Sequence, residues 1–324
     1  MKVISLFSGA GGLDLGFKNA GFDVVWANDI FKDAVKTYRM NIGDHIDDRD
    51  ITSIHSSDLP ECDGVIGGFP CQGFSLANTG RRVDDSRNIL YLEFVRIVRD
   101  LKPRFFVAEN VKGILSLGKG LVFSKIVEDF REAGYDVYYH LFNAADYGVP
   151  QRRERVFIFG VRKNLGLQKV YFPPAATHAQ KEKAHLLGLK PWVGIGQALA
   201  GLPDPESPNN LANHEASKYK LRFNGYLGHR VIDPSVPCPT ITARGDERGG
   251  VVIHHHPSNE RRLTAREAAI AQSFPIEFAF FGTKTSAYRQ IANAVPPALA
   301  EAVARAVRKS VERVEKVLTT RLSA

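Results

Sequence analysis

Cysteine is scarce in this chain of 324 residues: it occurs only as Cys62, Cys71 and Cys238, with no CxxC pair. Neither a disulfide framework nor a cysteine-based zinc site is indicated, which favours a reducing compartment, and we expect the cytoplasm. No apolar run approaches the roughly 18 residues that a membrane span needs. The N-terminus lacks the layout of a secretory signal. The chain also has no internal repeat and no low-complexity tract.

Acidic residues are outnumbered by basic ones, so the formal net charge is +8 at pH 7. A polyanion such as DNA or RNA suits such a chain, because each phosphate that Lys or Arg neutralises releases a condensed counterion. Charge alone leaves an ordinary basic protein equally open.

Short apolar runs alternate with segments of helical periodicity through the first half of the chain. Strands are expected at residues 3–7, 24–27, 64–67, 104–108, 136–142 and 156–159. Helices are expected at residues 13–20, 90–101, 122–133, 264–272 and 298–317. This alternation predicts an α/β fold with a doubly wound, mostly parallel sheet.

The pattern changes between about residues 172 and 260, which are rich in Pro, Gly, Asn and His and have few periodic runs. Helical patterns return after this stretch. We therefore expect one domain made of residues 1–175 and 284–324, interrupted by a smaller, irregular domain of residues 176–283.

The turn after the first predicted strand is rich in glycine, with Gly9, Gly11 and Gly12. Glycines permit a tight turn and a close approach of the backbone to a ligand. Asp29 lies about twenty residues further on, where an acid can accept hydrogen bonds from ribose hydroxyls. Asp50, at the expected end of a third strand, can accept from an adenine amino group. These features fit a nicotinamide dinucleotide as well as an adenosyl cofactor.

Two further segments break that tie. Residues 70–72 (Pro-Cys-Gln) follow a buried strand, and residues 109–111 (Glu-Asn-Val) end the next one. Both fall at the C-terminal edge of the predicted sheet, where open α/β folds bind their ligands. A lone cysteine is more often a small core residue, but beside a nucleotide site Cys71 is better explained as a nucleophile.

Five ordered motifs resemble those of the DNA cytosine-5 methyltransferases of bacterial restriction-modification systems. They lie at residues 7–12 (Phe-Ser-Gly-Ala-Gly-Gly), 70–72, 109–111, 151–155 (Gln-Arg-Arg-Glu-Arg) and 290–296 (Gln-Ile-Ala-Asn-Ala-Val-Pro). Residues 262–267 and 272–275 resemble a further motif of that family. The resemblance implies a Rossmann-like, S-adenosylmethionine-dependent catalytic domain (residues 1–175 and 284–324) and a target-recognition domain (residues 176–283).

The chemistry of such an enzyme explains why these residue types are needed. Carbon 5 of cytosine becomes nucleophilic only after a thiolate, here Cys71, adds to carbon 6. Cys71 must therefore be ionised, which a nearby cation or helix N-terminus would favour. A buried Glu109 with a raised pKa can protonate ring nitrogen 3. By resemblance, Arg155 holds the ring carbonyl and Arg153 braces Glu109 and the nearby backbone.

The same resemblance assigns the cofactor pocket. It places Phe7 against the adenine, Asp29 on the ribose, Asp50 on the adenine amino group, and Asn293 and Val295 at the methionine end. The cofactor-binding positions implied are Phe7, Gly9, Gly11, Gly12, Asp29, Ile30, Asp50, Ile51, Pro70, Asn293 and Val295.

A cytosine inside a duplex must flip out to meet the nucleophile. The loop of residues 72–87 is expected to close over the flipped base, and residues 239–245 resemble an element that enters the major groove. The predicted DNA-binding positions are Gln72, Ser75, Arg87, Thr240, Thr242 and Arg244. No metal is expected: the three histidines of residues 254–256 are better explained as a basic, solvated run.

Three positions depart from the family pattern. Phe69 stands where a second proline is usual, Ile30 where an aromatic residue often stacks on adenine, and Ala292 where glycine is usual. Their effects cannot be derived from the sequence, although the adenine contact at Ile30 is expected to be weaker.

Three alternatives stay open. An RNA-directed cytosine-5 methyltransferase needs the same chemistry, although the long inserted region favours duplex DNA. A nicotinamide-dependent dehydrogenase explains the glycines but leaves Cys71 and Glu109 without roles. A catalytically inactive regulator is disfavoured because both residues are present. We expect a monomer that acts on double-stranded DNA, and its compact layout is consistent with pairing to a restriction endonuclease.

Overall fold

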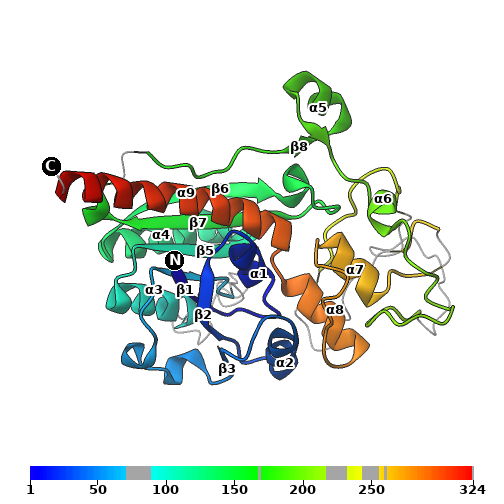
Figure 1. The fold of residues 1–324 in the computed structure, drawn as a ribbon, viewed down its shortest axis with the longest axis horizontal. Coiled ribbons are helices and arrows are strands. Elements are labelled where there is room, and N and C mark those ends of the chain that lie inside the picture. The colour runs from blue at the N-terminus through cyan, green and yellow to red at the C-terminus, as the bar shows by residue number, and fades with distance from the viewer. Residues whose placement is uncertain (71–88, 167–168, 217–231, 243–254, 259–260, 323–324) are drawn as a thin grey trace.

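The computed structural model describes residues 1–70, 89–166, 169–216, 232–242, 255–258 and 261–322. A seven-stranded sheet forms the centre of the larger part of the molecule, in the order β3-β2-β1-β4-β5-β7-β6 (Figure 1). Its strands are β1 (Lys2–Leu6), β2 (Asp23–Asn28), β3 (Ile46–Asp47), β4 (Gly64–Gly67), β5 (Phe105–Val111), β6 (Tyr135–Asn143) and β7 (Glu154–Arg162).

Strands β1 to β5 pair in parallel, whereas β7 runs antiparallel to both of its neighbours, β5 and β6. The predicted doubly wound, mostly parallel sheet is therefore confirmed, with one reversed strand. The order changes direction between β1 and β4, and in such sheets the crevice beyond the C-terminal ends of these strands is the usual ligand site.

Side chains of successive strand residues alternate between two hydrophobic layers, because the side-chain period of a strand is two. Val3 and Val107 pack into one layer with helices α1 (Gly12–Asn19) and α9 (Pro297–Leu322). Ile4 and Phe106 pack into the other layer with α3 (Ile89–Leu101) and α4 (Leu121–Glu132). Helices thus cover both faces of the sheet and leave its C-terminal edge to the loops.

The remaining elements are α2 (Lys32–Asn41), β8 (His178–Ala179), α5 (Lys181–Leu187), β9 (Lys190–Pro191), α6 (Ile195–Leu199), α7 (Ala265–Ala271) and α8 (Lys284–Asn293). α6, α7 and α8 share a separate hydrophobic cluster that also includes Ile241 and Phe274. α5, together with β8 and β9, projects from the body of the molecule (Figure 1). None of the described helices has the length and apolar character needed to cross a membrane.

Candidate active site and nucleotide pocket

The turn from β1 to α1 requires its glycines. Gly9 and Gly11 have φ of 55° and 89°, in the left-handed region that glycine tolerates. A Cβ atom at Gly12 would lie 2.3 Å from the Val295 carbonyl oxygen, so the glycine lets the turn approach this segment. At Gly9, by contrast, no atom of the described residues lies within 4 Å of such a Cβ. The turn therefore packs tightly on one side and leaves room for a ligand on the other.

Asp29 follows β2 and is tied to this turn. Its Oδ2 accepts from the Gly9 backbone N–H and its Oδ1 from the Phe31 N–H, both at 2.8 Å. Each oxygen keeps a second lone pair for a further donor. Burial raises the pKa of Asp29, the two backbone hydrogen bonds oppose that rise, and so does the charge of Arg289. Ile30 beside it is 63% exposed.

The next predicted pair, Asp50 and Ile51, follows β3. Asp50 caps a short 3-10 helix (Ile51–Ser53) by accepting from the backbone N–H and the hydroxyl of Thr52, at 2.9 and 2.7 Å. These bonds lower the pKa of Asp50, so the carboxylate is ionised near neutral pH. Ile51 is buried.

Glu109 and Arg155 lie close together at the C-terminal end of β5. They lie on the antiparallel strands β5 and β7, and Arg155 Nε is 2.9 Å from Glu109 Oε1. Glu109 is almost fully buried. Burial raises its pKa, and the charges of Arg155 and Arg153 act against that rise. A carboxyl group in this setting can stay protonated at a higher pH than a solvated one.

The turn that leads to Cys71 lies against this carboxyl group. A Cβ at Gly68 would be 2.8 Å from Glu109 Oε2, and Asn110 Nδ2 donates to the Phe69 carbonyl at 2.9 Å. The Phe69 ring is buried against Tyr91 and Phe94 of α3, so this departure from the family pattern fills the core. Cys71 itself, with Gln72, Ser75, Arg87 and Arg244, lies outside the described residues.

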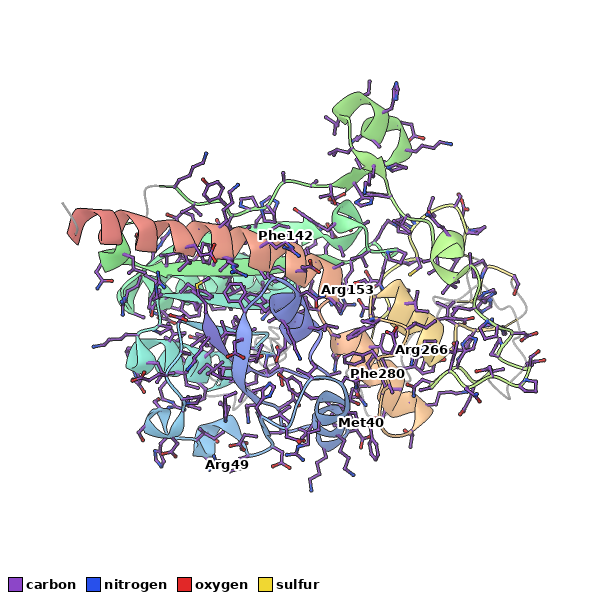
Figure 2. All side chains as sticks on the ribbon, viewed as in Figure 1. Met40, Arg49, Phe142, Arg153, Arg266 and Phe280 are labelled. Atoms are coloured by element: carbon purple, nitrogen blue, oxygen red, sulfur yellow. The ribbon has the colours of Figure 1, made fainter. Side chains whose placement is uncertain are left out.

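Arg153 is fully buried and has a different set of partners from those predicted. Its guanidinium donates to the carbonyl oxygens of Ile241 (2.9 Å), Ala294 (3.0 Å) and Ala292. Its charge acts on Glu109, while its hydrogen bonds go to these three backbone carbonyls, so the role of bracing Glu109 stays a prediction. Figure 2 shows Arg153 between the sheet and α7. The residue therefore ties the sheet to two segments distant in sequence.

The predicted major-groove element begins as an extension of this junction. Cys238 exchanges backbone hydrogen bonds with Pro150 and Arg152, and the Thr240 hydroxyl donates to the Arg152 carbonyl at 2.7 Å. Thr242 is exposed. Thr240 thus has a local structural contact, whereas Thr242 is placed at the surface.

The histidines of residues 254–256 were expected to be solvated. Of these, the structure describes His255 and His256, and neither is fully exposed. His255 is fully buried, and His256 Nε2 lies 3.8 Å from the Glu267 carboxylate, which also pairs with Arg261 at 2.7 Å. The expectation of a solvated run is therefore wrong for His255.

A buried polar network that the sequence did not predict lies under the β1–α1 turn. The Ser5 hydroxyl donates to Asp14 Oδ1 at 2.6 Å and the Tyr38 hydroxyl to Oδ2 at 2.8 Å. Burial raises the pKa of Asp14 to about 6, and these two hydrogen bonds oppose the rise. One signal was available: Asp14 lies three residues before Phe17, on the face of α1 that the sheet buries.

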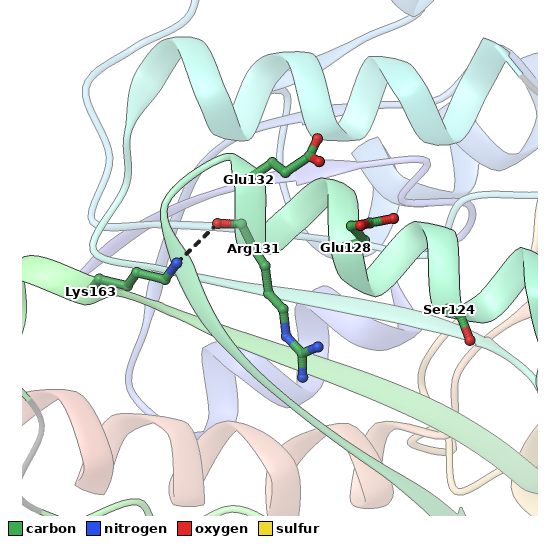
Figure 3. A pocket seen from close by; sticks show the side chains of 5 residues that line it. All are labelled: Ser124, Glu128, Arg131, Glu132 and Lys163. Atoms are coloured by element: carbon green, nitrogen blue, oxygen red, sulfur yellow. Dashed lines mark hydrogen bonds between the residues drawn. The ribbon is translucent and has the colours of Figure 1, made fainter.

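A hollow beside α4 stands apart from these residues (Figure 3). It is lined by Ser124, Glu128, Arg131, Glu132 and Lys163, and Lys163 Nζ donates to the Arg131 carbonyl at 3.2 Å. None of the predicted site residues lines it.

The fold and the site together define the class of protein. The family model of the C-5 cytosine-specific DNA methylases matches residues 1–309. The chain belongs to this family and is a DNA (cytosine-5-)-methyltransferase.

The similarity to individual relatives extends over nearly the whole chain. The chain is 41% identical to the type II methyltransferase M.NgoFVII of Neisseria gonorrhoeae, covering 91% of this chain and 83% of that protein. It is 38% identical to M.FnuDI of Fusobacterium nucleatum, covering 98% and 97%. A putative DNA modification methyltransferase encoded within a prophage of E. coli superposes with a TM-score of 0.74 at 29% identity, covering 96% and 99%.

Proposed function

We propose that this chain transfers a methyl group from S-adenosylmethionine to carbon 5 of a cytosine flipped out of a specific double-stranded DNA sequence, through a covalent bond to Cys71. The observation that carries the proposal is the Glu109–Arg155 pair, with Gly68 in contact range of the Glu109 carboxyl group. This arrangement puts the turn before Cys71 beside an acid with a raised pKa.

The other two cysteines are poor candidates for the nucleophile. Burial raises the pKa of both the Cys62 and the Cys238 thiols to about 12, so neither is ionised near neutral pH. Because the thiolate is the attacking species, Cys71 is the cysteine of choice.

The residues of the sheet edge then have distinct tasks. The Cys71 thiolate bonds to carbon 6 of the flipped cytosine while Glu109 gives a proton to ring nitrogen 3, so carbon 5 gains the electron density of an enamine. Arg155 orients Glu109 and reaches the ring carbonyl. After carbon 5 is methylated, water accepts its proton and the C5–C6 double bond re-forms. The carbon 6–sulfur bond breaks, the Cys71 thiolate leaves with the electron pair, and Glu109 takes back the proton of nitrogen 3. Arg153 holds the carbonyl groups of Ile241 and Ala294, which border the DNA and cofactor sides.

The nucleotide pocket fits an adenosyl cofactor. When bound, S-adenosylmethionine supplies an electrophilic methyl group. The open side of Gly9 admits the ligand, Asp29 accepts from the ribose, and Phe7 and Ile30 border the adenine, with Asp50 at its amino group. Beside Gly12, Val295 and the exposed Asn293 close the methionine end. Gly11, Ile51 and Pro70 complete the set of predicted cofactor positions.

The DNA side is proposed on similar grounds. Thr240 and Thr242 present the edge of the recognition region, and Gln72, Ser75, Arg87 and Arg244 would contact the target. The +8 net charge suits duplex DNA. We further propose that residues 176–283 form the recognition domain, that the protein acts as a monomer, and that it protects DNA from a partner restriction endonuclease.

Trapping of the covalent bond tests the proposal. Bisulfite sequencing of DNA from cells that express the chain first identifies the target. A duplex with 5-fluorocytosine at that position should then form a denaturation-resistant adduct in the presence of S-adenosylmethionine, because fluorine cannot leave as the carbon 5 proton does. Cys71→Ser should form no adduct yet still bind the cofactor, and Cys62→Ser should form it normally. An adduct with Cys71→Ser, or none with the unmodified enzyme, would overturn the proposal.

A further inference from the structure

Arg289 lies in α8, directly before the motif of residues 290–296, and has none of the roles predicted from the sequence. Its guanidinium carbon is 4.6 Å from the centroid of the Phe31 ring. Phe31 is the N-cap of α2 and donates its backbone N–H to Asp29. Arg289 therefore covers the residue that holds one oxygen of the predicted ribose acceptor.

The placement of Arg289 follows from hydrogen bonds between α8 and α2. The Thr37 hydroxyl donates to Gln290 Oε1 and the Ser286 hydroxyl to Asp33 Oδ2, both at 2.6 Å. Thr37 and Gln290 are buried, so these bonds are shielded from water. They hold α8 on α2 and so fix the position of the Arg289 side chain relative to the Phe31 ring.

Two charged side chains are coupled to Asp29. The charge of Asp29 raises the pKa of the buried Asp14 on α1. Arg289 on α8 is the cation whose charge lowers the pKa of Asp29 against the effect of burial.

We propose that Arg289 is a positioning residue for the adenosyl cofactor: its guanidinium group holds the Phe31 ring in place, so that the Phe31 N–H keeps the Asp29 carboxylate oriented to accept from the ribose hydroxyls. This inference rests on the proposed function, since it takes Asp29 as the ribose ligand. Arg289 acts through Asp29 and Phe31 and need not touch the cofactor. α8 also ends at Asn293, so one helix would serve both ends of the pocket.

Calorimetric titration of S-adenosylmethionine into the full-length protein tests this role. Arg289→Gln should weaken binding about tenfold, because a neutral amide cannot make the cation–π contact with the Phe31 ring. Arg289→Lys keeps the charge and should restore most of the affinity. Arg305→Gln, which removes an exposed arginine paired with Glu301 on α9, should bind like the unmodified protein.

The possible failures are distinct. Equal affinity of Arg289→Gln and the unmodified protein would overturn the inference. A loss of affinity that lysine does not restore would also overturn it, since that is the mark of packing alone. If the unmodified protein bound no S-adenosylmethionine, the proposed function would fail instead.

Discussion

Buried carboxylates govern the electrostatics at both ends of the site. Glu109 sits beside two arginines, whereas Asp14 is surrounded by neutral donors, the hydroxyls of Ser5 and Tyr38. Burial raises the pKa of both acids, but the consequence differs between them. A protonated Glu109 is useful to the proposed reaction, while Asp14 only fastens the β1–α1 turn to α2. Removing its charge should therefore change stability more than chemistry.

In Asp14→Asn, the free energy of unfolding should change less with pH between about 4 and 6 than in the unmodified protein. The folded-state pKa of Asp14 is about 6 against an ordinary value of 3.8, so between these pH values the folded protein binds more protons than the unfolded chain. The free energy of unfolding of the unmodified protein therefore falls as the pH rises from about 4 to 6, by up to about 3 kcal/mol. Asparagine cannot titrate, so the variant should gain relative stability across this window and hold the gain above it. Urea unfolding at pH 4.5, 5.5, 6.5 and 7.5 measures this, and a constant difference between the two proteins would contradict it.

At the scale of elements, periodicity predicted the long buried strands and helices well but missed four of the described helices, α2, α5, α6 and α8. Two of these, α2 and α8, pack on each other. α2 and α8 have few apolar residues, and polar side chains join them: Thr37 bonds to Gln290 and Asp33 to Ser286. Such pairs are 253 positions apart in the chain, and no local pattern reveals them. The reversed direction of β7 was also missed, although the lack of a predicted helix between residues 142 and 156 was a usable signal, since parallel strands need a crossover.

At Gly16, α1 packs directly against α9. A Cβ at Gly16 would lie 2.4 Å from the Ala300 Cβ and 2.6 Å from the Glu301 backbone nitrogen. Alanine is favoured over glycine inside a helix by about 1 kcal/mol. Gly16→Ala should nevertheless lower the free energy of unfolding by about 1–3 kcal/mol, because backbone atoms of α9 must move. Gly113→Ala is the matched control, since no described atom lies within 4 Å of its Cβ. Denaturant unfolding compares the two, and equal stabilities would mean that the helix contact yields without cost.

At the scale of the whole molecule, the site depends on contacts that bring distant segments to one sheet edge. The closeness of Glu109 to the residues before Cys71 could be predicted, because both lie at the C-terminal ends of recognisable strands. The partners of Arg153 could not: Ile241 and Ala294 are 88 and 141 positions away. Its resemblance-based role pointed at Glu109, whereas its hydrogen bonds join the sheet to the recognition side and to the segment after α8. Ala292, where the family usually has glycine, supplies one of the three carbonyl groups.

Arg153→Gln should loosen this junction without unfolding the sheet. A shorter amide cannot reach three carbonyl groups, and buried acceptors left without donors cost about 1–3 kcal/mol each. Hydrogen exchange followed by mass spectrometry should therefore show faster exchange at residues 238–242 and 291–296, while β1 and β4 keep their protection. Arg152→Gln, at the exposed neighbouring position, should exchange like the unmodified protein. The affinities for the cofactor and for DNA should fall together in Arg153→Gln, because one side chain binds both the Ile241 and the Ala294 carbonyl groups. Unchanged exchange in the two segments would remove Arg153 from this role, and faster exchange throughout β1 and β4 would show that it supports the whole fold instead.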